Sequence, residues 1–343
     1  MEIKVCRMEN KKALIITYYD APNYGAFLQA YSTQVFLREN GVEAKICRHI
    51  ANQPNIFNWV LDRRIPARSL AYRNSLKKRI NESQKYLCFD DPGENDFDLA
   101  IIGSDEVWNI KNLTALHLPI FFQPSKRAKR TIAYAVCAGR CEAKHLKLLP
   151  YTTGIRKLDA VSVRDTHTYE MAREFGINAP IRALDPTFLC KFGQSIPART
   201  VKNDYLLVYT YGLSEQSIYK IQEFSRREKL MVIATGSVCE WADENPIPNP
   251  FEWLSLIKNS KYVITSTFHG TVFSIQLNKQ FITIETTSGK VKSVLEELGL
   301  LDRLKAKNWN ADDLLLFPIQ YDGVNEKVEH RRQESAQFLL DNL

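Results

Sequence analysis

The sequence predicts an α/β protein with two domains, and three observations support this prediction. Short runs of β-branched and aromatic residues alternate with amphipathic segments along almost the whole chain, as strands and helices do in an α/β fold. At 343 residues the chain is long for a single hydrophobic core. Its hydrophobic fraction of 45% and charged fraction of 25% are typical of a soluble globular protein.

The first half of the chain begins this alternation with an apolar run at 12–19, which predicts a strand. Leu28, Tyr31 and Val35 then recur at helical spacing, so a helix is expected over 25–41. Further elements of this half are strands predicted at 42–47, 98–104, 130–136 and 158–165, and a helix at 166–177.

The second half repeats the alternation after a polar segment, 191–203, which contains glycine and proline and is the predicted domain boundary. Strands are predicted at 204–211, 230–236, 261–265 and 281–286, and helices at 214–229, 250–260, 271–277 and 293–304. We therefore expect domains over 1–192 and 200–324. The charged C-terminal helix, 325–343, is expected to pack back on the first domain.

Positive charge is concentrated in a predicted helical insertion, 55–86, within the first domain. Between Trp59 and Lys85 there are eight basic residues, and a second basic run, SKRAKR, occupies 125–130. Such patches attract anionic partners, among them phosphosugars and an anionic membrane surface. A solvated basic face is the alternative interpretation. No nucleic-acid-binding motif accompanies the charge, so no nucleic-acid partner is expected.

The seven cysteines are scattered and form no CxxC pair, which favours free thiols in a reducing compartment. Cys137 and Cys141 alone are too few to hold a metal ion, so no metal site is expected. No apolar run reaches the length of a membrane-spanning helix, and charged residues interrupt the first ten positions. These features predict a cytoplasmic protein, and the basic insertion adds the expectation of peripheral attachment to the inner face of the cytoplasmic membrane.

His269 lies in the segment TSTFHGTVFS (265–274), between a predicted strand and a helix expected to begin at Gly270 and Thr271. Strand-to-helix turns carry the chemistry of α/β folds. Histidine titrates near neutral pH and so suits proton transfer, and a helix N-terminus can bind an anion. The alternative interpretation is a structural histidine that bonds a backbone carbonyl group.

Arg164 follows another predicted strand, and its guanidinium could hold a carboxylate or phosphate with two hydrogen bonds. An ion pair with Asp165 or Asp185 is the alternative interpretation. Arg140 and Lys279 are weaker candidates for the same role.

Four segments at predicted strand ends resemble, as an ordered set, the signature blocks of the polysaccharide pyruvyltransferase family. They are APNYGAFLQAY (21–31), DLAIIGSDEVWN (98–109), VSVRDTHTYEMAREFGI (161–177) and TSTFHGTVFSIQLNKQFITI (265–284). LDPTFLC (184–190) and IAYAVCAGR (132–140) resemble two weaker blocks of that family. The resemblance implies two Rossmann-like domains arranged as in GT-B glycosyltransferases, with the active site in the cleft between them.

The resemblance also implies roles for residues in these blocks. His269, Arg164 and Asp105 are expected to be catalytic. The residues expected to bind substrate are Asn23, Tyr24, Gly25, Gly103, Ser104, Thr267, Gly270, Thr271 and Lys279. Capping and turn formation are the alternative for Asn23 and Asp105. Two positions depart from the family pattern: Thr267 stands where many members have arginine, and Cys137 stands where they have serine.

The function implied by the resemblance is transfer of pyruvate from phosphoenolpyruvate to a sugar, as a ketal. The first domain would hold the acceptor, a lipid-linked or polymeric glycan, and the second the donor. Phosphoenolpyruvate would be a co-substrate, and no cofactor is expected. Because a fold does not fix a function, two alternatives remain: a glycosyltransferase that uses a nucleotide sugar, and a non-catalytic glycan-binding relative.

Overall fold

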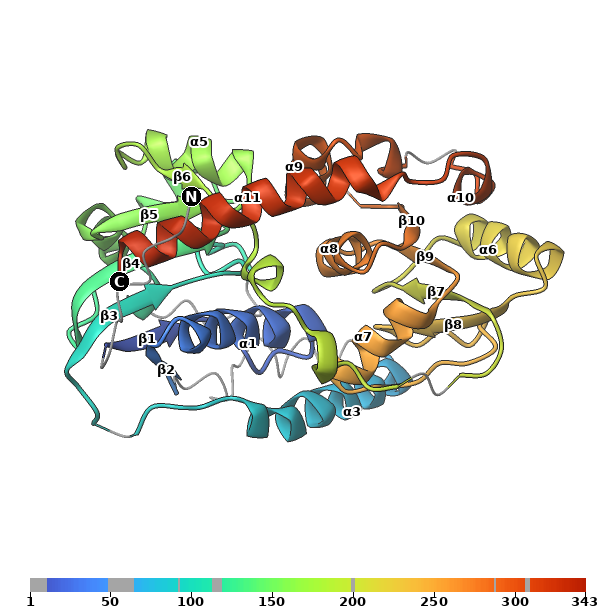
Figure 1. The fold of residues 1–343 in the computed structure, drawn as a ribbon, viewed down its shortest axis with the longest axis horizontal. Coiled ribbons are helices and arrows are strands. Elements are labelled where there is room, and N and C mark those ends of the chain that lie inside the picture. Colours follow the sequence, from blue (N-terminus) through green and yellow to red (C-terminus); the bar gives the residue numbers. More distant parts are fainter. Residues whose placement is uncertain are drawn as a thin grey trace.

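In the computed structural model the chain forms two α/β lobes that lie side by side (Figure 1). The structure describes residues 11–48, 65–91, 93–112, 119–198, 201–286, 288–305 and 309–343. The first lobe contains a six-stranded parallel sheet in the order β2-β1-β3-β4-β5-β6. Its strands are β1 (Lys12–Ile16), β2 (Glu43–Ile46), β3 (Phe97–Ile102), β4 (Ala128–Val136), β5 (Ala160–Val163) and β6 (Ile181–Arg182). Its helices are α1 (Tyr24–Glu39), α3 (Ala67–Ser83), α4 (Ala143–Leu146) and α5 (Thr166–Glu174).

The second lobe contains a four-stranded parallel sheet in the order β10-β9-β7-β8. Its strands are β7 (Tyr205–Tyr209), β8 (Met231–Thr235), β9 (Tyr262–Thr265) and β10 (Gln280–Thr283). Its helices are α6 (Glu215–Arg227), α7 (Pro250–Asn259), α8 (Phe268–Gln276), α9 (Gly289–Leu298) and α10 (Asp313–Leu316), and the chain ends with α11 (Tyr321–Asp341). Short 3₁₀ segments are η1 (Gln84–Tyr86), η2 (Pro119–Phe121), η3 (Pro150–Lys157), η4 (Pro186–Leu189), η5 (Gly193–Ser195) and η6 (Leu301–Arg303).

The central strands are apolar on both faces because helices cover both sides of a parallel sheet. In β1, Ala13 and Ile15 belong to one hydrophobic cluster, whereas Leu14 and Ile16 belong to another on the opposite face. The strands expected from apolar runs are confirmed within a few residues, and the sheets lie on either side of the segment 191–203. The short strand β6 was not predicted, because two residues carry no periodicity.

Helix α8 begins three residues earlier than predicted, at Phe268. Thr267 has an extended backbone, and its Oγ1 accepts a hydrogen bond from Gly270 N at 3.0 Å. Threonine is a favourable N-cap residue because it satisfies one of the free N–H groups of the first turn. His269 therefore belongs to the first turn of the helix. The N–H of Gly270, expected to be available to an anion, is already bonded.

The two lobes share a continuous hydrophobic cluster that runs from α1 into α7 and α8. The ring of Tyr24 stacks on Trp253 with centroids 5.0 Å apart, and Phe27 meets Phe251 edge-on at 6.1 Å. Burial of such large aromatic side chains contributes strongly to an interface. The contact between the lobes is thus part of the protein core.

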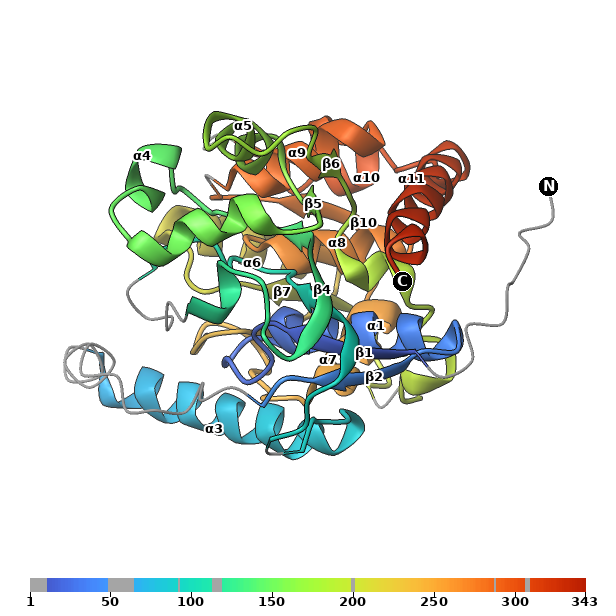
Figure 2. The same ribbon diagram turned by 90° about the vertical axis from the view of Figure 1, so that its left-hand side faces the viewer.

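Two helices cross from one lobe to the other, at opposite edges of the molecule (Figures 1 and 2). Helix α11 returns to the first lobe, where Leu184 N donates to Ser335 Oγ at 2.9 Å and Phe338 lies 6.1 Å from Tyr134. It begins at Tyr321, earlier than the expected 325. Helix α3 crosses in the other direction and packs on α7 and the end of β8.

Part of the described basic insertion contacts the second lobe. Arg68 pairs with Glu240, and Arg79 Nη2 lies 2.6 Å from Glu252 Oε2. The insertion was expected to present its charge outward, but these two arginines serve contacts between the lobes. Residues 55–64 of the insertion lie outside the described residues. Within the part of the chain that the structure describes, we find no helix long and apolar enough to cross a membrane.

Tyr72 of α3 provides a test of this crossing. Its buried hydroxyl accepts a hydrogen bond from Gly236 N at 3.0 Å and lies 3.2 Å from Thr235 Oγ1. We predict that Tyr72→Phe lowers the free energy of unfolding by about 1–3 kcal/mol, because Gly236 N is left without a partner. Urea denaturation measures the change. Tyr219→Phe, at an exposed position of α6, is the control and should change little. Equal effects of the two substitutions would contradict the assignment.

Candidate active site

A pocket of about 780 Å³ lies between the two lobes, at the carboxyl ends of both sheets. The first lobe contributes residues that follow β1, β3, β4 and β5, and the second lobe contributes residues that follow β7, β9 and β10. Ligands of open α/β sheets bind at this end of the strands. The pocket is formed from both lobes, so it depends on their contact.

His269 reaches the pocket from the first turn of α8 and is 5% exposed. Its Nε2 lies 3.6 Å from Asp185 Oδ2, which is close enough for an ion pair but long for a hydrogen bond. Its other ring nitrogen, Nδ1, lies against Gly25 of α1. A Cβ atom on residue 25 would come within 1.9 Å of this nitrogen. Gly25 is therefore needed for close approach of the histidine ring.

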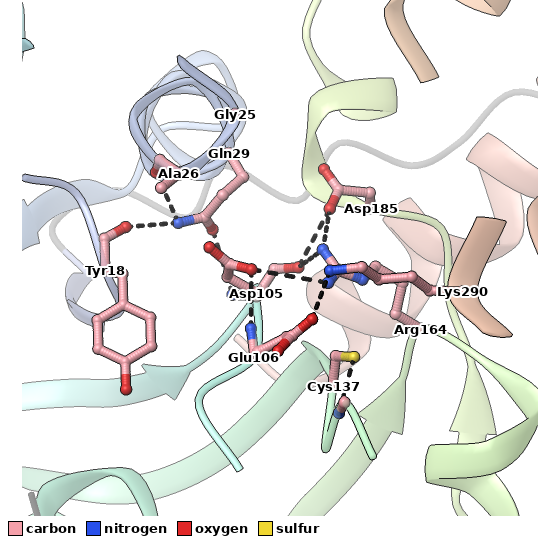
Figure 3. Close-up of polar contacts among 12 residues, drawn as sticks. Tyr18, Gly25, Ala26, Gln29, Asp105, Glu106, Cys137, Arg164, Asp185 and Lys290 are labelled. Carbon is pink, nitrogen blue, oxygen red and sulfur yellow. Dashed lines mark hydrogen bonds and ion pairs between the residues drawn. The ribbon is translucent and has the colours of Figure 1, made fainter. Parts of the chain in front are cut away.

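Asp185 is fully buried and follows β6 at the start of η4. Its Oδ2 accepts a hydrogen bond from Arg164 Nη1 at 2.6 Å, and its Oδ1 accepts from Thr187 N at 3.0 Å. Burial alone would raise the pKa of Asp185. The contact with His269, the charge of Arg164 and the Thr187 N–H outweigh burial and hold this pKa well below its usual range. Asp185 is thus an anion that contacts both Arg164 and His269, and Figure 3 shows its carboxylate beside the Arg164 guanidinium.

Arg164 is buried beneath Phe268, with its guanidinium carbon 4.4 Å from the ring centroid. The alternative interpretation, an ion pair with Asp185, describes its main contact, whereas Asp165 caps α5. Nη2 of Arg164 lies 3.8 Å from Asp105 Oδ1, and Nε and Nη2 have no hydrogen bond among the described residues. Phe268 lines the pocket, and Arg164 lies behind it. In this arrangement its guanidinium holds Asp185 and is not part of the pocket lining.

An ion pair joins the two lobes across the pocket. Lys290 Nζ, from α9, lies 2.6 Å from Glu106 Oε1, and Asn109 Nδ2 donates to Glu106 Oε2 at 2.6 Å. Burial would raise the pKa of Glu106, but the charge and hydrogen bond of Lys290 lower it to about 2. The same ammonium lies 5.5 Å from the centroid of the Phe268 ring. Figure 3 shows Lys290 and Arg164 directed at the carboxylates of Asp105, Glu106 and Asp185.

The start of α9 also faces the pocket. Its N-cap Ser288 makes no side-chain hydrogen bond to the helix, and the pocket is lined by Ser288, Gly289 and Lys290. The backbone N–H groups of Gly289 and Lys290 have no hydrogen bond within the described ranges. A helix N-terminus beside a lysine favours an anion. Arg140, a weaker candidate from the sequence, lines the same pocket.

The structure brings some predicted residues into the pocket wall, namely Asn23, Asp105, Thr267 and His269. Asn23 also caps α1, since its Oδ1 accepts from Gly25 N at 2.8 Å. Asp105 has a left-handed backbone, with φ of 66°, which turns its carboxylate toward Arg164. Asn23 therefore both caps α1 and lines the pocket.

Other predicted residues are buried behind the wall and support it. Ser104 donates to Ala135 O, Tyr24 bonds Thr235 between the lobes, and Thr271 bonds Thr283. Gly103 and Gly270 allow close packing, because a Cβ atom would lie 2.2 Å from Tyr134 O or 2.1 Å from Thr265 Oγ1, respectively. None of these five is among the residues that line the pocket, and each supports the wall from behind.

Lys279 lies outside the pocket lining. It lies at the start of β10, opposite the carboxyl ends that form the pocket, and its Nζ donates to Lys258 O at 3.1 Å. Conversely, the sequence interpretation missed Lys290, Glu106, Asp185 and His167 as site residues. Glu106 and Asp185 were inside the quoted blocks, whereas Lys290 lies in a segment without any motif. His167 lines the pocket and donates from Nε2 to Cys141 O at 2.7 Å.

A family model described as polysaccharide pyruvyl transferase matches residues 23–288 of this chain. The chain belongs to this family. The matched range includes Asn23, Asp105, Arg164, Asp185 and His269, and the suspected membership is confirmed. A search of curated proteins finds no match.

Solved structures similar to this family member confirm the predicted GT-B-like fold. A UDP-N-acetylglucosamine 2-epimerase matches with a TM-score of 0.54 and 12% identity, over 97% of this chain and 95% of that one. The UDP-GlcNAc 2-epimerase of Neisseria meningitidis matches with a TM-score of 0.51 and 10% identity, over 97% of this chain and 99% of that one. A putative UDP-N-acetylglucosamine 2-epimerase of Listeria monocytogenes matches with a TM-score of 0.50 and 10% identity, over 97% of this chain and 95% of that one. At such identities the likeness concerns the fold alone.

The two departures from the family pattern have structural explanations. Thr267 caps α8, as described above, and cations reach the pocket from elsewhere, notably from Lys290. Cys137 lines the pocket, and its Sγ accepts a hydrogen bond from Gly139 N at 3.3 Å. Burial raises the pKa of Cys137 to about 12, so the thiol is protonated at neutral pH. Among the described residues, no group of histidine, cysteine and acidic side chains could hold a metal ion.

The contact between Gly25 and His269 can be tested by a double-mutant cycle. We predict that Gly25→Ala lowers the free energy of unfolding by about 1–3 kcal/mol, because the added Cβ collides with the histidine ring. In the His269→Ala background the same change should cost much less. Gly323→Ala is the control, since a Cβ on this residue of α11 meets nothing. Additive effects in the cycle would show that the two residues do not interact.

The ion pair of Glu106 makes part of the stability depend on pH. Because the pKa of Glu106 is lowered to about 2, its contribution is present above its ordinary value near 4.5 and is lost as pH falls from there toward 2. We predict that the free energy of unfolding of Glu106→Gln changes less between pH 5 and pH 3 than that of the wild type. Glu223→Gln, at an exposed site of α6, should behave as the wild type. Urea denaturation at both pH values decides, and parallel behaviour of all three proteins would contradict the prediction.

Proposed function

We propose that this protein transfers pyruvate from phosphoenolpyruvate to a sugar of a glycan precursor, as a ketal, and releases phosphate. The observation that carries the proposal is the pair of His269 and Asp185 at a pocket between the lobes, within the range matched by the family. The pocket supplies a group that can exchange protons next to groups that can hold an anion. Both are required by this reaction.

The reaction has a simple proton balance. Two sugar hydroxyl oxygens bond to the central carbon of the donor, and the bond from that carbon to the phosphate oxygen breaks. One hydroxyl proton ends on the methylene carbon, which becomes a methyl group, and the other leaves with the phosphate. His269 is the residue that gives and takes these protons. Asp185 stabilises the protonated imidazole that forms in this exchange.

The donor anion would be held by the second lobe. Lys290, together with the N–H groups at the start of α9, forms a cationic end of the pocket, and Arg140 of the first lobe lines the same pocket. Binding of a phosphate there would compete with Glu106 for Lys290. Arg164 acts indirectly in this scheme, because it keeps Asp185 ionised.

The acceptor would enter from the first lobe, where Asp105 faces the pocket. We propose a lipid-linked or polymeric glycan as acceptor and a place of action in the cytoplasm, at the inner face of the membrane. No cofactor is needed, since phosphoenolpyruvate supplies both the pyruvyl group and the leaving phosphate. Exposed basic residues of α3, such as Lys78, are candidates for contact with an anionic membrane surface.

His269→Gln tests the proposal. We predict that it lowers kcat by about 10²–10⁴-fold, the usual scale of general acid–base catalysis, while phosphoenolpyruvate still raises the melting temperature. Release of phosphate is measured with a panel of lipid-linked glycans. His330→Gln, at an exposed position of α11, is the matched control.

The same preparation separates the alternatives. A rise in melting temperature with UDP-sugars and none with phosphoenolpyruvate would favour a nucleotide-sugar glycosyltransferase. A response to neither ligand would favour a non-catalytic relative. Normal turnover of His269→Gln would remove this residue from the mechanism.

A further inference from the structure

Tyr211 is an exposed aromatic side chain inside the pocket. It follows β7 and has 54% of its surface accessible to solvent. Among the exposed large apolar side chains in the described ranges, Tyr211 is the one that lines the pocket. An exposed aromatic ring in a concave site is available to a ligand that presents an apolar face.

The ring is held in place by the core between the lobes. Its hydroxyl lies 2.8 Å from the hydroxyl of Tyr209, and the two rings meet edge-on with centroids 5.7 Å apart. Tyr209 is itself buried and packs on Trp253 at 4.8 Å. Tyr211 is therefore ordered before any ligand binds, which reduces the entropy lost on binding.

The carboxylate of Asp105 acts on this tyrosine, and both residues line the pocket. Burial of its hydroxyl end raises the pKa of Tyr211 to about 12, and the nearby charge of Asp105 acts in the same direction. Asp105 Oδ1 accepts from Glu106 N at 2.8 Å, and Oδ2 accepts no hydrogen bond from any described residue. Glu285 lines the same wall, and its bonds to Ser214 and Ser217 outweigh burial and lower its pKa.

We propose that Tyr211 and Asp105 form the subsite for the acceptor's sugar ring. The C–H face of a pyranose stacks on Tyr211, and one of its hydroxyl groups donates to Asp105 Oδ2. The identification of this sugar as the acceptor rests on the proposed function. A nucleotide base could also stack on the ring, and a UDP probe in the experiment below distinguishes this ligand from a sugar. Asp105 Oδ2 can accept a hydrogen bond from a sugar hydroxyl group, so a neutral sugar is the ligand that this pair of residues fits.

Saturation-transfer NMR on the full-length protein tests the subsite, with the methyl glycosides of glucose, galactose and mannose as probes. We expect at least one probe to receive saturation at its ring C–H protons. Tyr211→Leu should weaken its binding about tenfold, the scale of one aromatic stacking contact. Tyr211→Phe should retain binding. Tyr219→Leu, which removes a tyrosine that is 61% exposed outside the pocket, is the matched control. Melting temperatures report whether each variant is folded.

The outcomes separate this inference from the proposed function. Absence of saturation on every methyl glycoside, or binding that Tyr211→Leu leaves unchanged, would overturn the subsite. So would Tyr211-dependent saturation of the uracil protons of UDP. Stabilisation by phosphoenolpyruvate is measured on the same variants and should survive Tyr211→Leu. If phosphoenolpyruvate fails to bind while the glycosides bind through Tyr211, the donor is wrong and the sugar subsite stands.

Discussion

The buried carboxylate of Asp185 joins the parts of the site that matter most. It is fully enclosed, so it can remain ionised only because His269, the Arg164 guanidinium and the Thr187 N–H group surround it. Arg164 comes from the first lobe and His269 from the second, and both converge on the same oxygen, Oδ2. Removing one member of a buried ion pair typically costs about 3–5 kcal/mol. The carboxylate therefore couples the charge of the site to the contact between the lobes.

That contact is maintained by apolar packing and by the two crossing helices. Tyr24 and Trp253 stack within a cluster that belongs to both lobes, α3 bonds the end of β8, and α11 returns to the first sheet. The histidine ring fits only because residue 25 has no side chain. Separation of the lobes would remove His269 from Asp185 and open the pocket, so the chemistry proposed here requires the closed arrangement.

Within the pocket, charge and shape are distributed unevenly. Lys290, Arg140 and the start of α9 give one part a cationic character that suits a phosphate. Tyr211 gives another part an exposed aromatic surface near the charge of Asp105, which suits a neutral sugar. His269 lines the same pocket, and it is the residue that we propose for the proton exchange between these two ligands. Thr267 is neutral at a position where many family members are expected to carry arginine. In this pocket Lys290 supplies the positive charge instead.

The sequence by itself determined the α/β alternation, the position of His269 after β9 and membership of the family, because each depends on local periodicity or on contiguous motifs. Only the tertiary structure decided which charged side chains pair with one another. Lys290 and Glu106 are 184 residues apart, and neither residue's local pattern indicates the other. Arg164 was compatible with either a ligand or a carboxylate until the fold enclosed it with Asp185. Lys279 shared a motif with His269, but α8 carries the chain from one end of the sheet to the other between them. Spacing along a chain does not specify which end of a strand, or which lobe, a side chain will face.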